Sequence, residues 1–501
     1  MANRTLAGPD AFRYRYLLGL DIGTLGVKGV VVRLDGQVVA RQHLDHSVSH
    51  PHPGWAEHDA NRHWWGDGRA VIQALLAQVQ LPPETIVGVG VCGLVPCLCP
   101  LDVKGQPLRP AILYADNRAL VELDSVNRIL GTTLTAQAVI PKLLWLKVHE
   151  PGVFAQTQAV LSAHHYVVYR LTGHLAVDYD SASVYGAVFD ASAGKWRADV
   201  CESLGIPVEM LPQPRPATHV VGQVTRAAAQ ETGLAPGTPV IAGSGDTFPT
   251  IVGAGAVEPG AALISFGTTG LLLLVGRPLE EVTDKVHFGP GPNGESPAIR
   301  WAANVLTCGR AVQWFRDRFA PESDYSALDD DAAQVPPGSD GLIALPHFLG
   351  RRTPTPDPRA RGAYVGLTLV HTSAHLYRAL LESFGYALRQ GFEPERGQVR
   401  RVVATAGGAR SRLWRQIVSD ILDMPVEYSP QSGGALGIAY LAGYATGCFS
   451  DLSTIRNQWL GPPEVTSPHP GARAVYDRLY GVYSALDEEL GPQMARLAAD
   501  G

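Results

Sequence analysis

Charged side chains are scarce in this 501-residue chain, at 18% of the total, and the formal net charge is only −6. No strong field of one sign gathers nucleic acid or anionic lipid, which favours a small-molecule substrate. No apolar run reaches the roughly 20 residues needed to span a bilayer, and residues 1–16 lack the apolar core of a signal peptide. The sequence therefore predicts a soluble, cytoplasmic protein that binds neither nucleic acid nor membranes.

Cysteine is also infrequent, with six in the chain, which excludes a disulfide scaffold and agrees with a reducing compartment. Three cysteines lie between positions 92 and 99, but no second Cys or His pair stands at zinc spacing. We therefore interpret them as small fillers of a strand. The Pro-rich surroundings of His46, His50 and His52 favour a surface loop over a metal site.

Two common nucleotide-binding motifs are missing: the G-x-x-x-x-G-K-[ST] loop and a G-x-G-x-x-G turn that opens a helix. Residues 17–32 (LLGLDIGTLGVKGVVV) instead read as two apolar strands joined by a Gly-Thr turn, and residues 264–275 (ISFGTTGLLLLV) repeat the pattern. Such turns let backbone N–H groups and hydroxyls approach phosphate oxygens closely. A single turn would equally suit a plain β-hairpin. Two of them favour half-sites for one triphosphate, and hence phosphoryl transfer.

The length of the chain predicts two domains, because single hydrophobic cores stop growing at roughly 250 to 300 residues. Strand-like runs at residues 86–93, 239–245, 341–345 and 401–408 alternate with amphipathic helices, which predicts an α/β protein with partly parallel sheets. We place the domain boundary just before the second Gly-Thr hairpin. The predicted domains are residues 1–254 and 255–501.

Two helices are predicted in the second domain from apolar side chains at three- and four-residue spacing. The first carries apolar residues from Leu376 to Leu388, with Thr372 or Ser373 as its cap. The second follows Ser411. Each would bury one face against a core.

Asp246 is the candidate general base. It follows a strand inside the segment G-S-G-D-T, where flanking glycines let another molecule approach and the strand end directs the carboxylate outward. A base must lie within hydrogen-bond reach of the hydroxyl that it activates. The alternative is a structural aspartate that caps the following helix. Asp21, beside the first Gly-Thr turn, is the candidate ligand of Mg²⁺, directly or through water.

Several segments, spaced in order from about residue 17 to 447, carry a resemblance to a known family. Among them are DIGTLGVK, GWAEHDANRHWW, YADNRA, RLTGHLAVDYDSAS, GSGDTFPT, SFGTTG and ATAGGARSRLWRQIVSD. Together they resemble the FGGY family of carbohydrate kinases, and most of all its xylulokinase branch. The resemblance implies two actin-like (ribonuclease H-like) ATPase domains flanking a central cleft. It also implies that residues 1–254 bind the sugar, that residues 255–501 bind the nucleotide, and that the cofactors are ATP and Mg²⁺.

The resemblance also implies roles for single residues. Asp246 matches the acceptor of the sugar hydroxyl proton, and Asp21 matches the acid near Mg²⁺ and the phosphates. The implied phosphate and nucleotide contacts are Thr24, Gly267, Thr268, Gly309, Gln313, Gly407, Gly408 and Arg412. Arg412 departs from the asparagine of glycerol kinases, which leaves its contact open.

The acceptor side matches the family less well. Xylulokinases follow the equivalent strand with Gln-Met-His, whereas Gly93 is followed here by Leu94, Val95 and Pro96. An apolar wall discriminates poorly among polyols, which leaves open a substrate other than D-xylulose. The implied acceptor contacts are Val95, Pro96, Asp116 and Thr247. An ion pair between Asp116 and Arg118 that holds a loop is an equal alternative for these two residues.

The sequence thus predicts a kinase that transfers the γ-phosphoryl group of ATP to a hydroxyl of a ketose such as D-xylulose, or of a related sugar or polyol. A non-catalytic actin-like sugar sensor or ATPase is the alternative. Both Gly-Thr turns and Asp246 are present and no basic appendage is, which disfavours a sensor. A homodimer is an open expectation, since relatives commonly form one.

Overall fold

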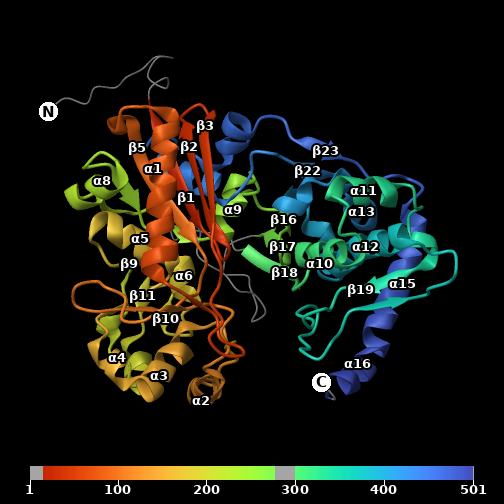
Figure 1. Cartoon of the computed structure of the whole chain (residues 1–501), viewed down its shortest axis with the longest axis horizontal. Helices are drawn as coiled ribbons and strands as arrows, with labels where there is room; N and C mark the ends of the chain where they lie inside the picture. The colour runs from red at the N-terminus through yellow and green to blue at the C-terminus, as the bar shows by residue number, and fades with distance from the viewer. Residues whose placement is uncertain (1–14, 277–298, 500–501) are drawn as a thin grey trace.

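The computed structural model describes residues 15–276 and 299–499. These residues form two mixed β-sheets covered by helices, which confirms the predicted α/β class (Figure 1). Nearly all of the segment examined for a signal peptide lies outside the described residues. Within the described ranges, no helix has both the length and the apolar character required to cross a membrane.

The two sheets have the same strand order and the same directions. In spatial order the first contains β3 (Val38–Asp45), β2 (Gly26–Arg33), β1 (Tyr16–Ile22), β5 (Ile86–Gly93), β14 (Pro239–Ile241) and β13 (Val220–Gln223), with β15 (Ser244–Gly245) also paired to β5. The second contains β18 (Ile299–Val305), β17 (Gly270–Val275), β16 (Ala261–Phe266), β21 (Arg401–Thr405), β22 (Val426–Tyr428) and β23 (Glu464–Thr466). Each sheet has three antiparallel strands, then two parallel strands, then an antiparallel edge. The two predicted Gly-Thr turns therefore occupy equivalent hairpins, β1–β2 and β16–β17.

Helices and short ribbons fill the rest of the chain. The α-helices are α1 (Asp67–Val79), α2 (Leu120–Leu130), α3 (Val139–His149), α4 (Pro151–Gln156), α5 (Ala163–Thr172), α6 (Tyr179–Ser183), α7 (Ala198–Ser203), α8 (Arg226–Thr232), α9 (Thr247–Gly253), α10 (Gly309–Phe319), α11 (Tyr325–Ala333), α12 (Ser373–Phe392), α13 (Arg412–Leu422), α14 (Gly434–Ala445), α15 (Arg473–Glu489) and α16 (Gly491–Ala499). The short strand pairs are β4 (Glu57–His58) with β7 (Ala111–Ile112), β6 (Cys99–Leu101) with β8 (Ala159–Leu161), β9 (Ala176–Asp178) with β12 (Gln213–Arg215), β10 (Phe189–Asp190) with β11 (Lys195–Trp196), and β19 (Ile343–Leu345) with β20 (Ala363–Val365).

The strand predicted at residues 239–245 is interrupted. Gly243 has φ +81°, a left-handed conformation that favours glycine, and a Cβ built on it would lie 2.1 Å from the backbone oxygen of Val91. The chain therefore bends at Gly243 and pairs with β5 again as β15, which carries Ser244 and Gly245 to the end of the sheet. The run predicted at 401–408 ends as a strand at Thr405.

Both helices predicted in the second half are confirmed, with their caps. Thr372 is the N-cap of α12, where it forms a capping box with His375. At the start of α13, Ser411 Oγ accepts a hydrogen bond of 3.0 Å from the backbone N–H of Trp414. The apolar face of α13 is buried in the core of the second sheet.

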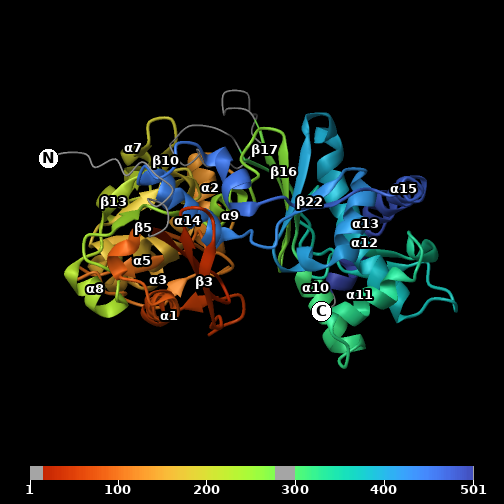
Figure 2. The same cartoon turned by 90° about the horizontal axis from the view of Figure 1, so that it is seen from above.

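Two helices, α9 and α14, lie between the sheets (Figure 2). Helix α14 belongs to the second half of the sequence but packs against β1 and β5 of the first sheet. Glycines permit this close approach: a Cβ on Gly19 of β1 would lie 2.0 Å from the Ala435 oxygen, and one on Gly90 of β5 would lie 2.4 Å from the Ile438 oxygen. Gly437 permits the packing of α14 on α9, since its Cβ would lie 1.8 Å from the Pro249 oxygen. The two halves of the chain therefore share one packed layer, formed by α9 and α14.

The clustered cysteines are confirmed as buried strand and turn residues. Cys92 lies in β5 and Cys99 in β6, and all six cysteines are free thiols. Burial raises the pKa of Cys97 to about 12. Such thiols act as small core side chains.

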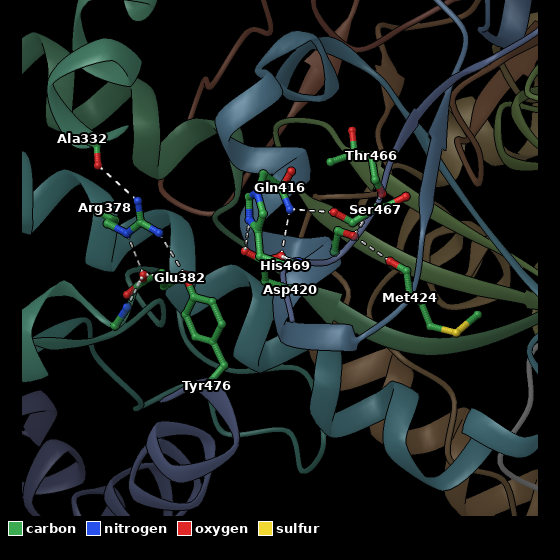
Figure 3. A network of polar contacts seen from close by, with 12 residues as sticks. Ala332, Arg378, Glu382, Gln416, Asp420, Met424, Thr466, Ser467, His469 and Tyr476 are labelled. Atoms are coloured by element: carbon green, nitrogen blue, oxygen red, sulfur yellow. Dashed lines mark hydrogen bonds and ion pairs between the residues drawn. The ribbon is translucent and has the colours of Figure 1, made fainter. Parts of the chain in front are cut away.

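A buried polar network stabilises the second half (Figure 3). Glu382 in α12 accepts hydrogen bonds of 2.9 Å from four groups: Arg378 Nε, the Tyr476 hydroxyl, the Gly338 N–H and the Ser339 hydroxyl. Arg378 also donates to the Ala332 oxygen. Both charges are buried and well supplied with partners, as the cost of desolvation requires.

Candidate active site

Two carboxylates lie at the carboxyl end of the first sheet. Asp21 near the end of β1 is opposite Cys92 of β5, and Ser244 of β15 pairs with the same cysteine from the other side. Asp246 directly follows β15, and its N–H donates to the Gly93 oxygen at 3.1 Å. Asp21 and Asp246 therefore flank the end of β5, close enough for the charge of Asp21 to act on Asp246.

Asp246 is held by the backbone, but its carboxylate is largely uncommitted. The residue occupies the N-cap position of α9 without forming a side-chain capping hydrogen bond, which disfavours the alternative of a capping aspartate. The Thr247 hydroxyl donates to Oδ1 at 3.4 Å. The residue is exposed to solvent, yet dense protein around it and the charge of Asp21 raise its pKa to about 6. Burial likewise raises the pKa of Asp21.

The first Gly-Thr turn is held by a histidine. The His46 N–H donates to the Leu25 oxygen at 3.0 Å, and His46 Nε2 lies 3.1 Å from the Gly23 oxygen. Its Nδ1 lies 2.9 Å from Asp67 Oδ2. Both ring nitrogens face oxygen atoms, and these two contacts fix the orientation of the ring.

The surface-loop interpretation of His46 is therefore wrong. Only 3% of its side chain is exposed, because the Gly-Thr turn and α1 enclose it. His50 and His52 are exposed, as predicted.

The second Gly-Thr turn lies on the start of α10. The Gly309 N–H donates to the Gly267 oxygen at 2.8 Å, and the Cys308 N–H donates to the Thr268 oxygen at 3.1 Å. A Cβ on Gly309 would lie only 2.8 Å from the Gly267 oxygen, so glycine permits this approach. Thr268 and Gln313 are exposed nearby, on the turn and on α10. The structure therefore brings four of the predicted nucleotide residues together.

The glycines after β21 lie beside the same turn. A Cβ on Gly408 would lie 3.1 Å from the Phe266 oxygen, directly before Gly267, and 2.7 Å from the Trp414 ring. Gly407 has open space at its Cβ position, and Arg412 is exposed at the start of α13. These residues thus adjoin the turn of β16 and β17.

The segment 432–434 connects the second sheet to Asp21. The Ser432 hydroxyl lies 3.3 Å from that of Thr405, at the end of β21. A Cβ on Gly434 would lie 3.2 Å from Asp21 Oδ2. One short segment therefore contacts the ends of β21 and β1, one strand from each sheet.

The predicted acceptor residues separate into two groups. Val95 follows β5, and its Cγ2 lies 2.6 Å from a Cβ built on Gly245, so Val95 lies beside the segment that carries Asp246 and Thr247. Pro96 follows it in the chain and is buried. Asp116 is fully buried and accepts from the Ala56 N–H at 2.6 Å and from Arg118 at 2.7 Å. This geometry favours the ion-pair alternative for Asp116, and its contact with an acceptor stays a prediction.

Asp180 was not among the predicted site residues. Its segment, RLTGHLAVDYDSAS, served only as a family signature, and no spacing distinguished this carboxylate from its neighbours. In the structure, a Cβ on Gly245 would lie 3.3 Å from Asp180 Oδ2. Burial, together with the charges of Asp178 and Asp246, raises the pKa of Asp180 to about 7.

Comparison with known proteins agrees with this arrangement. Residues 16–253 match the N-terminal domain, and residues 262–446 the C-terminal domain, of the FGGY family of carbohydrate kinases. The chain belongs to this family. It is similar to the xylulose kinase of Escherichia coli strain K12, with 31% identity over 500 residues that cover 95% of this chain and 100% of the relative.

Solved structures of FGGY kinases share the fold. The xylulose kinase from Rhodospirillum rubrum superimposes with a TM-score of 0.84 at 33% identity, covering 96% of this chain and 100% of the other. The gluconate kinase from Lactobacillus acidophilus has a TM-score of 0.86 at 26% identity, covering 96% and 99%. This FGGY protein is an ATP-dependent sugar kinase with a two-domain α/β fold, as predicted.

Proposed function

We propose that this kinase phosphorylates a hydroxyl of a ketose or polyol, with D-xylulose as the first candidate, and that Asp246 is its general base. The observation that carries the proposal is the position of Asp246. Its carboxylate lies at a sheet end beside Val95 and Thr247, is exposed, and has no cationic partner among the described residues. Relatives named xylulose kinase support the choice of sugar.

Asp246 suits the task in its chemistry. A general base works best when its pKa lies near the operating pH, and the dense protein around Asp246, together with the charge of Asp21, raises its pKa to about 6. At neutral pH it is mostly a carboxylate, ready to accept the hydroxyl proton as the oxygen attacks the γ-phosphorus. Positioning and charge stabilisation supply most of the catalysis in phosphoryl transfer.

The two Gly-Thr turns are proposed to bind the phosphates. Thr24 lies on one turn, while Gly267 and Thr268 form the other with Gly309 at the start of α10. The first N–H groups of α10 already donate to this turn, so the helix favours an anion here through the positive end of its dipole. Gln313, Gly407, Gly408 and Arg412 are proposed to line the nucleoside.

Asp21 fits a magnesium ion by its chemistry. Mg²⁺ prefers oxygen ligands and commonly uses one carboxylate together with substrate phosphates. The Asp21 carboxylate lies between the first turn and the start of α14, and burial raises its pKa in spite of the opposing charge of Lys28. When bound, the ion would neutralise charge on the phosphates.

The acceptor is proposed to contact Val95, Pro96 and Thr247, with Asp116 as a further prediction. We also propose that residues 1–254 bind sugar and residues 255–501 bind nucleotide around a central cleft. Helix α14, from the second half of the sequence, packs on the first sheet and so connects the two parts. A homodimer and a cytoplasmic location stay predictions.

The proposal is tested by incubating the full chain with ATP and Mg²⁺ and a panel of neutral ketoses and polyols. We expect ADP release that depends on D-xylulose or a related acceptor, and formation of the sugar phosphate by mass spectrometry. ADP release that is equal with and without every acceptor would support the ATPase alternative. Omission of Mg²⁺ tests the metal in the same assay.

A further inference from the structure

A small group of side chains surrounds Gly245, next to the proposed base. We call it the Gly245 cluster, and it consists of Val95, Asp180, Ser181 and Gly245. A Cβ built on Gly245 would lie 2.6 Å from Val95 Cγ2, 3.3 Å from Asp180 Oδ2 and 3.9 Å from Ser181 Oγ. Only a glycine lets these groups meet, one residue before Asp246.

The polar members of the Gly245 cluster lack partners. Asp180 forms no hydrogen bond or ion pair with any residue that the structure describes, although it is only partly exposed. The Ser181 and Ser244 hydroxyls are buried and have no hydrogen-bond partner within the described chain. Buried polar groups are normally paired with protein or ordered water, so these groups are available to hydrogen-bond a molecule at the acceptor site.

Asp178, two residues before Asp180, differs because it has several hydrogen-bond partners. Asp178 accepts hydrogen bonds of 2.9 Å from His164, His165 and the Ser181 N–H, all buried. These bonds fix the start of α6 and therefore the place of Asp180. The carboxylate of Asp180 is thus held in position without being used by the protein.

The charges around the Gly245 cluster are acidic. Asp178 and Asp246 are the charged groups that act on Asp180. Two cations of the same domain have other partners. Lys142 donates to backbone oxygens at 2.9 and 3.0 Å, and Arg118 pairs with Asp116. At neutral pH Asp246 is mostly ionised and Asp180 is about half ionised, so an acceptor that carried a carboxylate here would meet like charge.

We infer that Asp180 is an acceptor-binding residue that hydrogen-bonds a second hydroxyl of an uncharged sugar or polyol, and that it selects against sugar acids. This assignment rests on the proposed function, in which Asp246 receives the proton of the reacting hydroxyl. Asp180 supplies the polar contact that the apolar residues Leu94, Val95 and Pro96 cannot. A hydrogen-bonding site of this kind discriminates far better among polyols than an apolar wall.

The test compares Asp180→Ala with Asp180→Asn, which keeps hydrogen-bonding atoms but not the charge. KM and kcat are measured for D-xylulose, for D-gluconate and for ATP. In Asp180→Ala we expect kcat/KM for the ketose to fall roughly 10- to 100-fold, mainly through KM, with the ATP KM unchanged. Asp180→Asn should recover most of the ketose KM and reduce the preference for ketose over gluconate.

Asp124→Ala, an exposed carboxylate on α2, is the matched control, and thermal melting shows whether each variant is folded. An active wild type whose ketose KM is unchanged in Asp180→Ala would overturn this assignment and leave the proposed function intact. A wild type that prefers D-gluconate would overturn it as well. A wild type with no acceptor-dependent ADP release from any neutral sugar would overturn the proposed function itself.

Discussion

Glu382 and Asp246 are acidic side chains placed in dense protein, yet they differ in their partners. Glu382 accepts four hydrogen bonds and pairs with Arg378, whereas Asp246 has one weak hydrogen bond and a neighbouring carboxylate. In the first arrangement every buried charge is compensated, so the fold depends on both partners being present. The second leaves charge available, and such uncompensated groups cluster at functional sites. The difference distinguishes a carboxylate that supports the fold, Glu382, from one that is available for catalysis, Asp246.

The contrast between Glu382 and Asp246 would fail if Asp246 were not needed for catalysis. Asp246→Asn removes the base and should lower kcat about 10²- to 10⁴-fold, measured by acceptor-dependent ADP release. The same change also removes charge beside Asp21, so the melting temperature at pH 8 should stay equal or rise. Full activity in this variant would reject the assignment of the base.

Glu382→Ala should act on stability instead. It leaves Arg378 buried without its carboxylate and should lower the free energy of unfolding by about 3–5 kcal/mol, measured by chemical denaturation. Glu322→Ala, an exposed residue, is the control and should have little effect. A loss below about 1 kcal/mol in Glu382→Ala would show that the network of Figure 3 contributes little.

The pH dependence of activity and of stability gives a further test of the role of Asp246. Asp246 must be ionised to act, and its pKa is raised to about 6, so kcat/KM should fall about tenfold per pH unit below 6. The folded chain also holds this proton more tightly than the unfolded chain. The stabilisation that it contributes is thus present below about pH 4 and lost as the pH rises through 6. A profile that is flat down to pH 5 would contradict the assignment.

Ser411→Ala should have the smallest effect. Loss of the cap of α13 should cost about 1 kcal/mol of stability, and Ser411→Asn, which keeps an acceptor for the Trp414 N–H and a donor for the Asp329 carboxylate, should restore most of it. The ATP KM reports any shift of the adjacent Gly407 and Gly408. Equal stability of Ser411→Ala and the wild type would show that this cap is unimportant.

Much of the architecture could be predicted from local patterns. The apolar spacing and cap of α13, the paired Gly-Thr hairpins and the exposed strand-end position of Asp246 all follow from short segments of sequence. Packing over long distances could not be predicted in this way. The bend at Gly243 depends on the backbone at Val91, and α14 packs on the first sheet because Gly19 and Gly90 leave space for it.

Neighbouring residues determine the strands, the helix caps and the two Gly-Thr turns of this kinase. Backbone preferences and hydrophobic periodicity act over only a few positions, so the sequence alone predicts these features. The roles of His46 and Asp180 are different. Folding encloses His46 against the Gly23 turn, and it brings Asp180 beside Gly245, which is 65 residues away in the chain. Burial, charge and hydrogen bonding between such distant residues exist only once both sheets have assembled.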